Sequence, residues 1–204
     1  NIIMAGTIPK PNRLNLNPML SPKGRIIGDF TVTCLNDEEF QLTASYGSQE
    51  YHLRWFLQNK KNGVNIENIS DKMNGFQIAG PNSRKLLQKV TNFSLEDFKF
   101  RDAHTILVGN ISCLVQRVSY TGDLGFEIYC DPNKQCDLWE VLWSAGAEFD
   151  IKPFGMRAMM SLRLDKFFGS WLSEFSPDYT PTETGLDKFI NFKKDYDFIG
   201  KLAY

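Results

Sequence analysis

The sequence predicts an α+β fold built from mixed, mainly antiparallel sheets with packed helices. Strand-like and helix-like segments follow one another without the steady alternation of a doubly wound parallel sheet. Apolar residues make up 42% and charged residues 23% of the 204 residues, which excludes disorder along the whole chain. A chain of this length can bury roughly 70% of its unfolded surface. We therefore expect a single domain with two interlocked subdomains, at about 1–68 and 69–204.

Strand patterns dominate the start of the chain. Four prolines within the first 22 residues exclude a regular helix there and predict an extended lead-in or a strand edge. Apolar and β-branched residues from Arg25 to Thr33 predict a strand. Residues 39–44 alternate between polar and apolar, so they should form a hairpin with that strand. Ser48 is then expected to cap a helix that ends at Asn62-Gly63.

The remainder of the chain mixes strands and helices. Strands are expected at 75–79, 105–108, 112–118 and 126–130, and helices at 84–90, 133–147 and 157–166. Gly109 and Asn110 are residue types that readily adopt positive φ, which suits a tight turn between two strands. Asn133 is expected to cap the long amphipathic helix.

Charge and hydropathy exclude several classes of partner. The net charge of −1 gives no chain-wide basic surface for nucleic acid. No apolar run approaches the ~20 residues that span a bilayer, so no membrane partner is expected. Asn1 is not followed by the basic and apolar regions of a signal peptide. We therefore expect a cytoplasmic location, or the mitochondrial matrix in a eukaryote.

Common catalytic and metal-binding signatures are missing. The sequence lacks the GxGxxG, GxxxxGK[ST] and GxSxG motifs of dinucleotide, P-loop and hydrolase sites. The cysteines are Cys34, Cys113, Cys130 and Cys136, and none of them forms a CxxC pair. With only two histidines as well, no metal site is expected, and the cysteines are predicted to be free thiols.

Glu127 is an acidic residue within an apolar strand that follows a glycine-rich turn at 119–125. A purely structural interpretation places it on the exposed face of an edge strand, or in an ion pair with Arg117 or Arg157. A functional interpretation makes it a carboxylate that binds a two-donor edge, such as an amidine or an aminopyrimidinone.

Asp29 similarly interrupts an apolar strand, directly after Gly28. It could be the outward residue of a β-bulge, or a carboxylate in a cleft that takes a proton or stabilises a cation. Two further residues are predicted to have packing roles. His52 is expected at the surface or against a helix, and Trp171 in the core, with pocket lining as its alternative.

Six stretches carry a family resemblance, in order along nearly the whole chain. They are Pro18–Phe30, Ile78–Pro81, Ser119–Glu127, Ser161–Lys166, Pro181–Asp187 and Phe198–Lys201. Through them the chain resembles the folate-binding aminomethyltransferase domain of the glycine-cleavage T-protein family. It is most similar to the version at the C-terminal end of dimethylglycine and sarcosine dehydrogenases.

The resemblance implies a tetrahydrofolate site. Glu127 matches the family's pterin-binding glutamate, Tyr120 a nearby tyrosine, and Asp29 the catalytic aspartate. A carboxylate can accept two hydrogen bonds from the N–H and amino edge of a pterin, and a second carboxylate can relay a proton and stabilise an iminium ion. Arg157 is carried over as a further ligand, although Met159 occupies the place of the family's arginine.

The chain is truncated relative to the family, whose first strands should precede Asn1 and whose C-terminal barrel should follow Tyr204. The expected function is tetrahydrofolate-dependent transfer of an aminomethyl or methylene group from a small N-methyl or aminomethyl donor. A flavin domain or a carrier protein is a possible partner. The alternatives are a folate-dependent demethylase on the same fold, a non-catalytic folate-binding module, and an interaction domain without a ligand.

Overall fold

The computed structural model describes residues 2–204, and these divide into two compact units. The first unit contains the residues up to Asn68 together with Gly169–Tyr204, and the second contains Ile69–Phe168. The sequence instead predicts that 169–204 belong to the second subdomain, at about 69–204. These residues cluster with the first unit because their backbone bonds to its N-terminal segments, for example from Asn191 N to Ala5 O at 3.0 Å.

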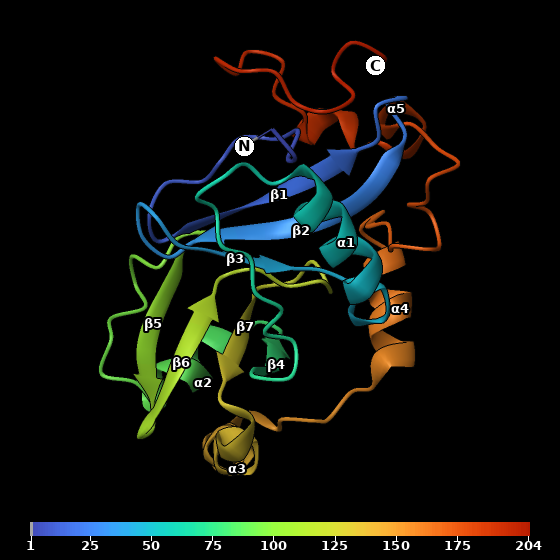
Figure 1. The fold of residues 1–204 in the computed structure, drawn as a ribbon. Coiled ribbons are helices and arrows are strands. Elements are labelled where there is room, and N and C mark those ends of the chain that lie inside the picture. The colour runs from blue at the N-terminus through green and yellow to red at the C-terminus, as the bar shows by residue number, and fades with distance from the viewer. Residues whose placement is uncertain (1) are drawn as a thin grey trace. The chain divides into compact units, whose positions relative to one another are not determined.

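A three-stranded antiparallel sheet forms the centre of the first unit (Figure 1). Its strands are β1 (Arg13–Leu20), β2 (Ile26–Cys34) and β3 (Phe40–Thr43), in the order β1-β2-β3. The hairpin predicted for β2 and β3 is confirmed by their register, which pairs Cys34 with Phe40. As predicted, the proline-rich residues 2–12 contain no helix, and a turn at 11–12 leads into β1.

Short helices complete the first unit. They are the 3₁₀ turn η1 (Tyr46–Ser48), α1 (Gln49–Asn59), α5 (Pro181–Thr184) and the 3₁₀ turn η4 (Asp187–Phe189). Ser48 does precede α1, but among the described residues its side chain makes no capping hydrogen bond, because η1 already leads into the helix. Thr180 and Glu183 form a capping box at α5.

The second unit contains a four-stranded antiparallel sheet in the order β4-β7-β6-β5. The strands are β4 (Asn74–Ala79), β5 (Ala103–Val108), β6 (Ile111–Gln116) and β7 (Gly125–Cys130). The helices are α2 (Ser83–Lys89), α3 (Gln135–Gly146) and α4 (Met156–Leu164), with the 3₁₀ turns η2 (Pro132–Lys134) and η3 (Ala147–Phe149). The predicted antiparallel α+β class is therefore confirmed.

The core of the second unit joins the inner faces of its strands to α2 and α3. Phe126, Ile128, Leu87 and Leu138 are fully buried within one apolar cluster. One predicted cap was wrong. Asp131, not Asn133, supplies the capping oxygen, because its side chain accepts a hydrogen bond from Asn133 N at 2.8 Å and starts η2 before α3.

Candidate functional site

Asp29 lies on β2, immediately beside an irregularity in the strand. Met19 pairs with Gly28 and Leu20 pairs with Ile26, so Ile27 is an extra residue between the two pairs. Such a bulge locally bends a strand and redirects its side chains. The bulge that the sequence suggested near Asp29 is thus present, and it lies two residues before the carboxylate.

The Asp29 carboxyl is half-buried and titrates close to neutrality. Burial raises its pKa from 3.8 to about 6, and a hydrogen bond from its own backbone amide opposes this rise. A carboxyl with a pKa near 6 exchanges its proton readily around physiological pH, as general acids and bases must. Asp29 therefore has the electrostatic properties of a proton-transfer group.

His52 packs from α1 against the bulged segment of β2. Its ring nitrogen Nε2 lies 3.1 Å from the carbonyl oxygen of Ile27, and its ring centroid lies 4.8 Å from that of Phe30. Only 2% of His52 is exposed, and this burial lowers its pKa, so the ring is neutral at pH 7. Its packing role is confirmed, but it is not at the surface.

Trp171 belongs to the core of the first unit, as predicted. It is 8% exposed and packs with Ile26, Phe175 and Leu186. Its ring centroid lies 5.1 Å from that of His52. The indole therefore packs against the histidine ring.

Glu127 lies on β7, an inner strand with β4 on one side and β6 on the other. The predicted position on an edge strand was therefore wrong. Tyr129 Oη donates a hydrogen bond to Glu127 Oε2 at 2.8 Å, and Gln77 Nε2 donates to Oε1 at 3.4 Å. Arg117, one of the arginines considered as an ion-pair partner, donates instead to the carbonyl of Phe98 at 2.9 Å.

Glu127 is half-buried, and this burial raises the pKa of its carboxyl. Burial is the largest cause, and the hydrogen bonds from Tyr129 and Gln77 act in the opposite direction because they favour the charged form. Such a carboxylate gains more from a ligand's N–H donors than an exposed one does, since water competes less for its oxygens.

The glycine-rich turn that precedes β7 is held by hydrogen bonds within the second unit. Leu124 O accepts hydrogen bonds from Gly80 N at 2.8 Å and from Ser83 Oγ at 3.0 Å. Gly122 adopts φ of 75°, a conformation that favours glycine. Tyr120, in the same turn, stacks on Phe168 with ring centroids 6.3 Å apart.

The four predicted site residues are divided between the two units. Glu127, Tyr120 and Arg157 belong to the second unit, where Arg157 is an exposed residue in the first turn of α4. Asp29 belongs to the first unit.

Sequence reasoning did not identify Gln77 and Tyr129. Tyr129 follows Glu127 by two residues, so strand alternation alone places both side chains on one face of the sheet. That signal was available in the sequence. Gln77 is opposite Glu127 only because β4 pairs with β7 in this particular register, which no local pattern reveals.

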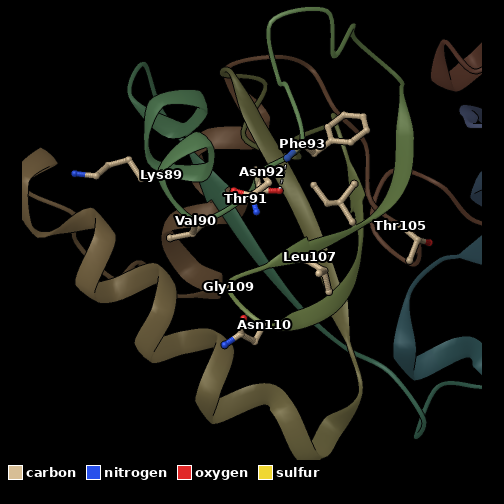
Figure 2. Close-up of a pocket in the computed structure, with 10 residues that line it drawn as sticks. Lys89, Val90, Thr91, Asn92, Phe93, Thr105, Leu107, Gly109 and Asn110 are labelled. Atoms are coloured by element: carbon tan, nitrogen blue, oxygen red, sulfur yellow. Dashed lines mark hydrogen bonds between the residues drawn. The ribbon is translucent and has the colours of Figure 1, made fainter.

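A hollow of about 650 Å³ in the second unit contains none of the predicted site residues. Figure 2 shows the segment Lys89–Phe93 on one side of it and the β5–β6 hairpin, with Thr105 and Leu107, on the other. Its ammonium group, on Lys89, is paired with Glu148. Size alone does not make this hollow the reactive site, because Lys89, the one ionisable side chain among its described lining residues, is held in an ion pair.

A smaller hollow, of about 380 Å³, lies beside β4 and α3. Gln77 and Met159 line it, together with apolar residues that include Trp139 and Trp143. This hollow therefore borders β4 at the residue that hydrogen-bonds Glu127. It also reaches the position in α4 where the family resemblance expects an arginine.

Residues 2–204 contain neither a metal-binding cluster nor a membrane-spanning helix. No group of three or more His, Cys, Asp or Glu side chains in this range could hold a metal ion. In the same range, every helix is too short or too polar to cross a bilayer. The cysteines described there are all free thiols.

Comparison with known proteins identifies the family. Residues 1–194 match the model of the GCVT N-terminal domain, so the chain belongs to that family. It is 40% identical to the mitochondrial dimethylglycine dehydrogenase of Homo sapiens, over 98% of this chain and 24% of that protein. It is 31% identical to the aminomethyltransferase of Natranaerobius thermophilus, over 94% of this chain and 53% of that protein.

A solved structure shares the fold. The crystal structure of glycine cleavage system aminomethyltransferase T from Bartonella henselae superposes with a TM-score of 0.82 at 20% identity. The match covers 98% of this chain and 55% of the other. The chain thus spans about a quarter to a half of the length of these relatives, whose names describe enzymes.

Proposed function

We propose that this chain is the folate-binding part of a tetrahydrofolate-dependent one-carbon transferase. In this proposal Glu127 anchors the pterin, Tyr120 lines the site, Arg157 assists binding, and Asp29 acts in the transfer of an aminomethyl or methylene group. Family membership supports the general class. The observation that carries the assignment to folate is the environment of Glu127.

The Glu127 carboxylate has the acceptor capacity that a pterin edge requires. An ionised carboxylate offers about four lone-pair positions on its two oxygens. Tyr129 and Gln77 each use one position, on different oxygens. About two positions are therefore available, one on each oxygen, which suits the adjacent N–H and amino donors of a pterin ring. Because Glu127 is half-buried, a ligand can still reach it.

Asp29 supports the catalytic half of the proposal. Bound tetrahydrofolate supplies the nitrogen atoms that receive the one-carbon group. The carboxyl of Asp29, with a pKa of about 6, can hold or release a proton at its oxygen during such a transfer. In its ionised form it also stabilises a nearby cation. These two properties favour transfer over a purely binding role.

The donor is proposed to be a small N-methyl amine or an aminomethyl group on a carrier. The names of the relatives, a dimethylglycine dehydrogenase and an aminomethyltransferase, suggest these two chemistries. A flavin domain or a carrier protein would then be the partner. Because the dehydrogenase relative is named as mitochondrial, a mitochondrial compartment is included in the proposal.

Isothermal titration with 5-formyltetrahydrofolate, a stable reduced folate, tests the pterin site. A hydrogen bond to a charged group contributes about 1.5–3 kcal/mol, so Glu127→Ala should weaken binding by about ten- to a hundredfold. Glu140→Ala, which removes an exposed glutamate from α3, serves as the matched control and should bind like the unmodified chain. Equal folate affinity in the Glu127→Ala variant would show that the pterin does not bind at Glu127.

Turnover separates the proposed transfer from its alternatives. Formation of a one-carbon folate from an N-methyl or aminomethyl donor supports the transferase. Release of a demethylated product with other methyl donors would favour the demethylase, and folate binding without turnover on any donor would favour a binding module. These assays should use the chain both alone and together with a flavin domain or a carrier protein.

A further inference from the structure

The carboxylate of Glu127 is held from two neighbouring positions on the same sheet. Tyr129 lies two residues further along β7 and reaches back to Oε2, while Gln77 lies directly opposite Glu127 on β4 and reaches Oε1. With one oxygen bonded from each direction, rotation of the carboxylate about its last side-chain bond would break a hydrogen bond. The plane of the carboxylate is therefore fixed before any ligand arrives.

Gly75 makes the position of Tyr129 possible. Gly75 is the cross-strand partner of Tyr129, and a Cβ atom built on it would lie 2.8 Å from Tyr129 Cδ1 and 2.9 Å from Cε1. Real carbon atoms do not approach so closely, so the tyrosine ring occupies the space that a side chain at position 75 would need. An aromatic ring that covers a cross-strand glycine is a known way to stabilise a sheet.

We propose that Gly75, Gln77 and Tyr129 form a positioning set that fixes the orientation of the Glu127 carboxylate for a two-donor ligand. This inference deepens the proposed function and rests on it for the identity of that ligand as a pterin. The three residues act through Glu127. Gly75 admits the ring, the ring brings the hydroxyl to Oε2, and Gln77 fixes Oε1.

One buried atom supports a binding role for this set. Among the described residues, the amide oxygen Oε1 of Gln77 is buried without a hydrogen-bond partner. Because unsatisfied buried acceptors are rare, this oxygen is a further place where a donor on the ligand could bind. Gln77 also lines the smaller hollow beside β4.

Titration of Glu127 by carbon-13 NMR tests the positioning set without any ligand. The carboxyl signal is assigned from its disappearance in Glu127→Gln. Loss of the hydroxyl in Tyr129→Phe keeps the ring but removes a donor to the charged form, so the apparent pKa of Glu127 should rise by about one unit. Gln77→Leu should shift it in the same direction by less, because its bond is longer. An unchanged pKa in Tyr129→Phe would overturn the proposal.

The glycine is tested by a double-mutant cycle. Gly75→Ala should displace the ring and raise the pKa of Glu127, yet should add nothing in the Tyr129→Phe background, where no hydroxyl is left to displace. Gly47→Ala is the matched control, since a Cβ there meets none of the described atoms within 4 Å. Additive shifts would show that Gly75 acts independently of Tyr129, which contradicts the set. If Gly75→Ala does not fold, Tyr129→Phe still carries the test.

Ligand binding distinguishes a failure of this inference from a failure of the proposed function. Tyr129→Phe should weaken 5-formyltetrahydrofolate binding about tenfold, with a larger loss at low pH than at high pH. Binding that depends on Glu127 but ignores Tyr129 and Gln77 would overturn the positioning set alone. If the unmodified chain binds no folate, the proposed function fails, whereas the NMR titration still decides whether the set orients Glu127.

Discussion

The ring of His52 occupies the space where a side chain on Gly28 would be. A Cβ atom built on Gly28 would lie 2.8 Å from His52 Nε2, and the same nitrogen lies 3.1 Å from the carbonyl oxygen of Ile27. Helix α1 is thus fitted to the β2 bulge immediately before Asp29. A substitution at Gly28 or His52 should therefore alter the position of the proposed catalytic carboxyl of Asp29.

Gly28→Ala should destabilise the protein by about 1–3 kcal/mol, as overpacking of a filled core usually does. The double variant with His52→Ala should lose less stability than the sum of the two single losses, although Phe30 also lies 2.9 Å from the added carbon. Urea unfolding of the two single variants and the double variant measures this coupling. Strictly additive losses would show that the contact between the two residues is unimportant.

Asp29→Asn should abolish transfer and yet stabilise the fold at neutral pH. The raised pKa of Asp29 means that the folded protein holds this proton more tightly than the unfolded chain does. The stability that the protonated Asp29 contributes is present below pH 3.8 and is lost as the pH rises through about 6. A shift from 3.8 to about 6 corresponds to about 3 kcal/mol, the upper limit of the gain expected at pH 8.

Unfolding of Asp29→Asn at pH 4 and pH 8, combined with a folate-binding assay, checks this prediction. The gain in stability should be small at pH 4, and folate affinity should persist at both values. A variant that is less stable than the unmodified protein at pH 8 would contradict the cost assigned to this buried charge. A normal transfer rate would remove Asp29 from the mechanism.

His52 should make a pH-dependent contribution of the opposite sign. Its folded-state pKa is lowered by burial, so the stability that it contributes is present above pH 6.5 and is lost as the pH falls through the lowered value. His52→Gln should therefore flatten the acid side of the stability profile. Urea midpoints between pH 5 and pH 8 measure this. Asp29→Asn is measured in parallel, because it removes the opposing contribution of Asp29 and should make the loss of stability towards acid pH steeper.

Folate binding should weaken as the pH falls through the raised pKa of Glu127. The ligand's N–H donors bind the ionised carboxylate, and protonation turns one acceptor oxygen into a donor. Titration calorimetry across pH 4 to 8 follows the change. Glu127→Gln should bind weakly at every pH, because an amide does not ionise in this range. An equally steep pH dependence in this variant would point to another titrating group.

Arg157→Ala should weaken folate binding only two- to fivefold, as expected for an exposed ion pair of about 0.2–1 kcal/mol. The effect should diminish at high salt, because exposed charges are screened. Lys152→Ala, which also removes an exposed cation near α4, is the control. A loss at Arg157 that salt does not change would indicate a direct, buried contact instead.

Local patterns predicted most elements of this fold, and long-range pairing explains most of what they missed. The alternation in 39–44 and the apolar strand around Asp29 were sufficient for the hairpin of β2 and β3. The inner position of β7 could not be predicted, because strand order depends on which surfaces pack together and not on the strand's own residues. For the same reason, Glu127 seemed a candidate for an exposed edge.

The candidate site was predictable only in part. The family motifs selected Glu127 and Asp29, and burial raises the pKa of both carboxyls in the fold. The residues that orient Glu127 follow from the register of β4 against β7, and Gly75 gave no signal that distinguished it from a turn glycine. Cross-strand neighbours become visible only once the pairing is known.

The division of the chain has a consequence for its synthesis. Since 169–204 belong with the N-terminal segments, Ile69–Phe168 is an insertion within a discontinuous domain. On the ribosome, the inserted unit is complete before the host unit has received its last third. Its four-stranded sheet can therefore fold first, whereas the unit that contains β1 to β3 is completed only after 169–204 have been synthesised. A fragment cut after Asn68 should consequently be prone to aggregation, whereas 69–168 is the segment to express alone.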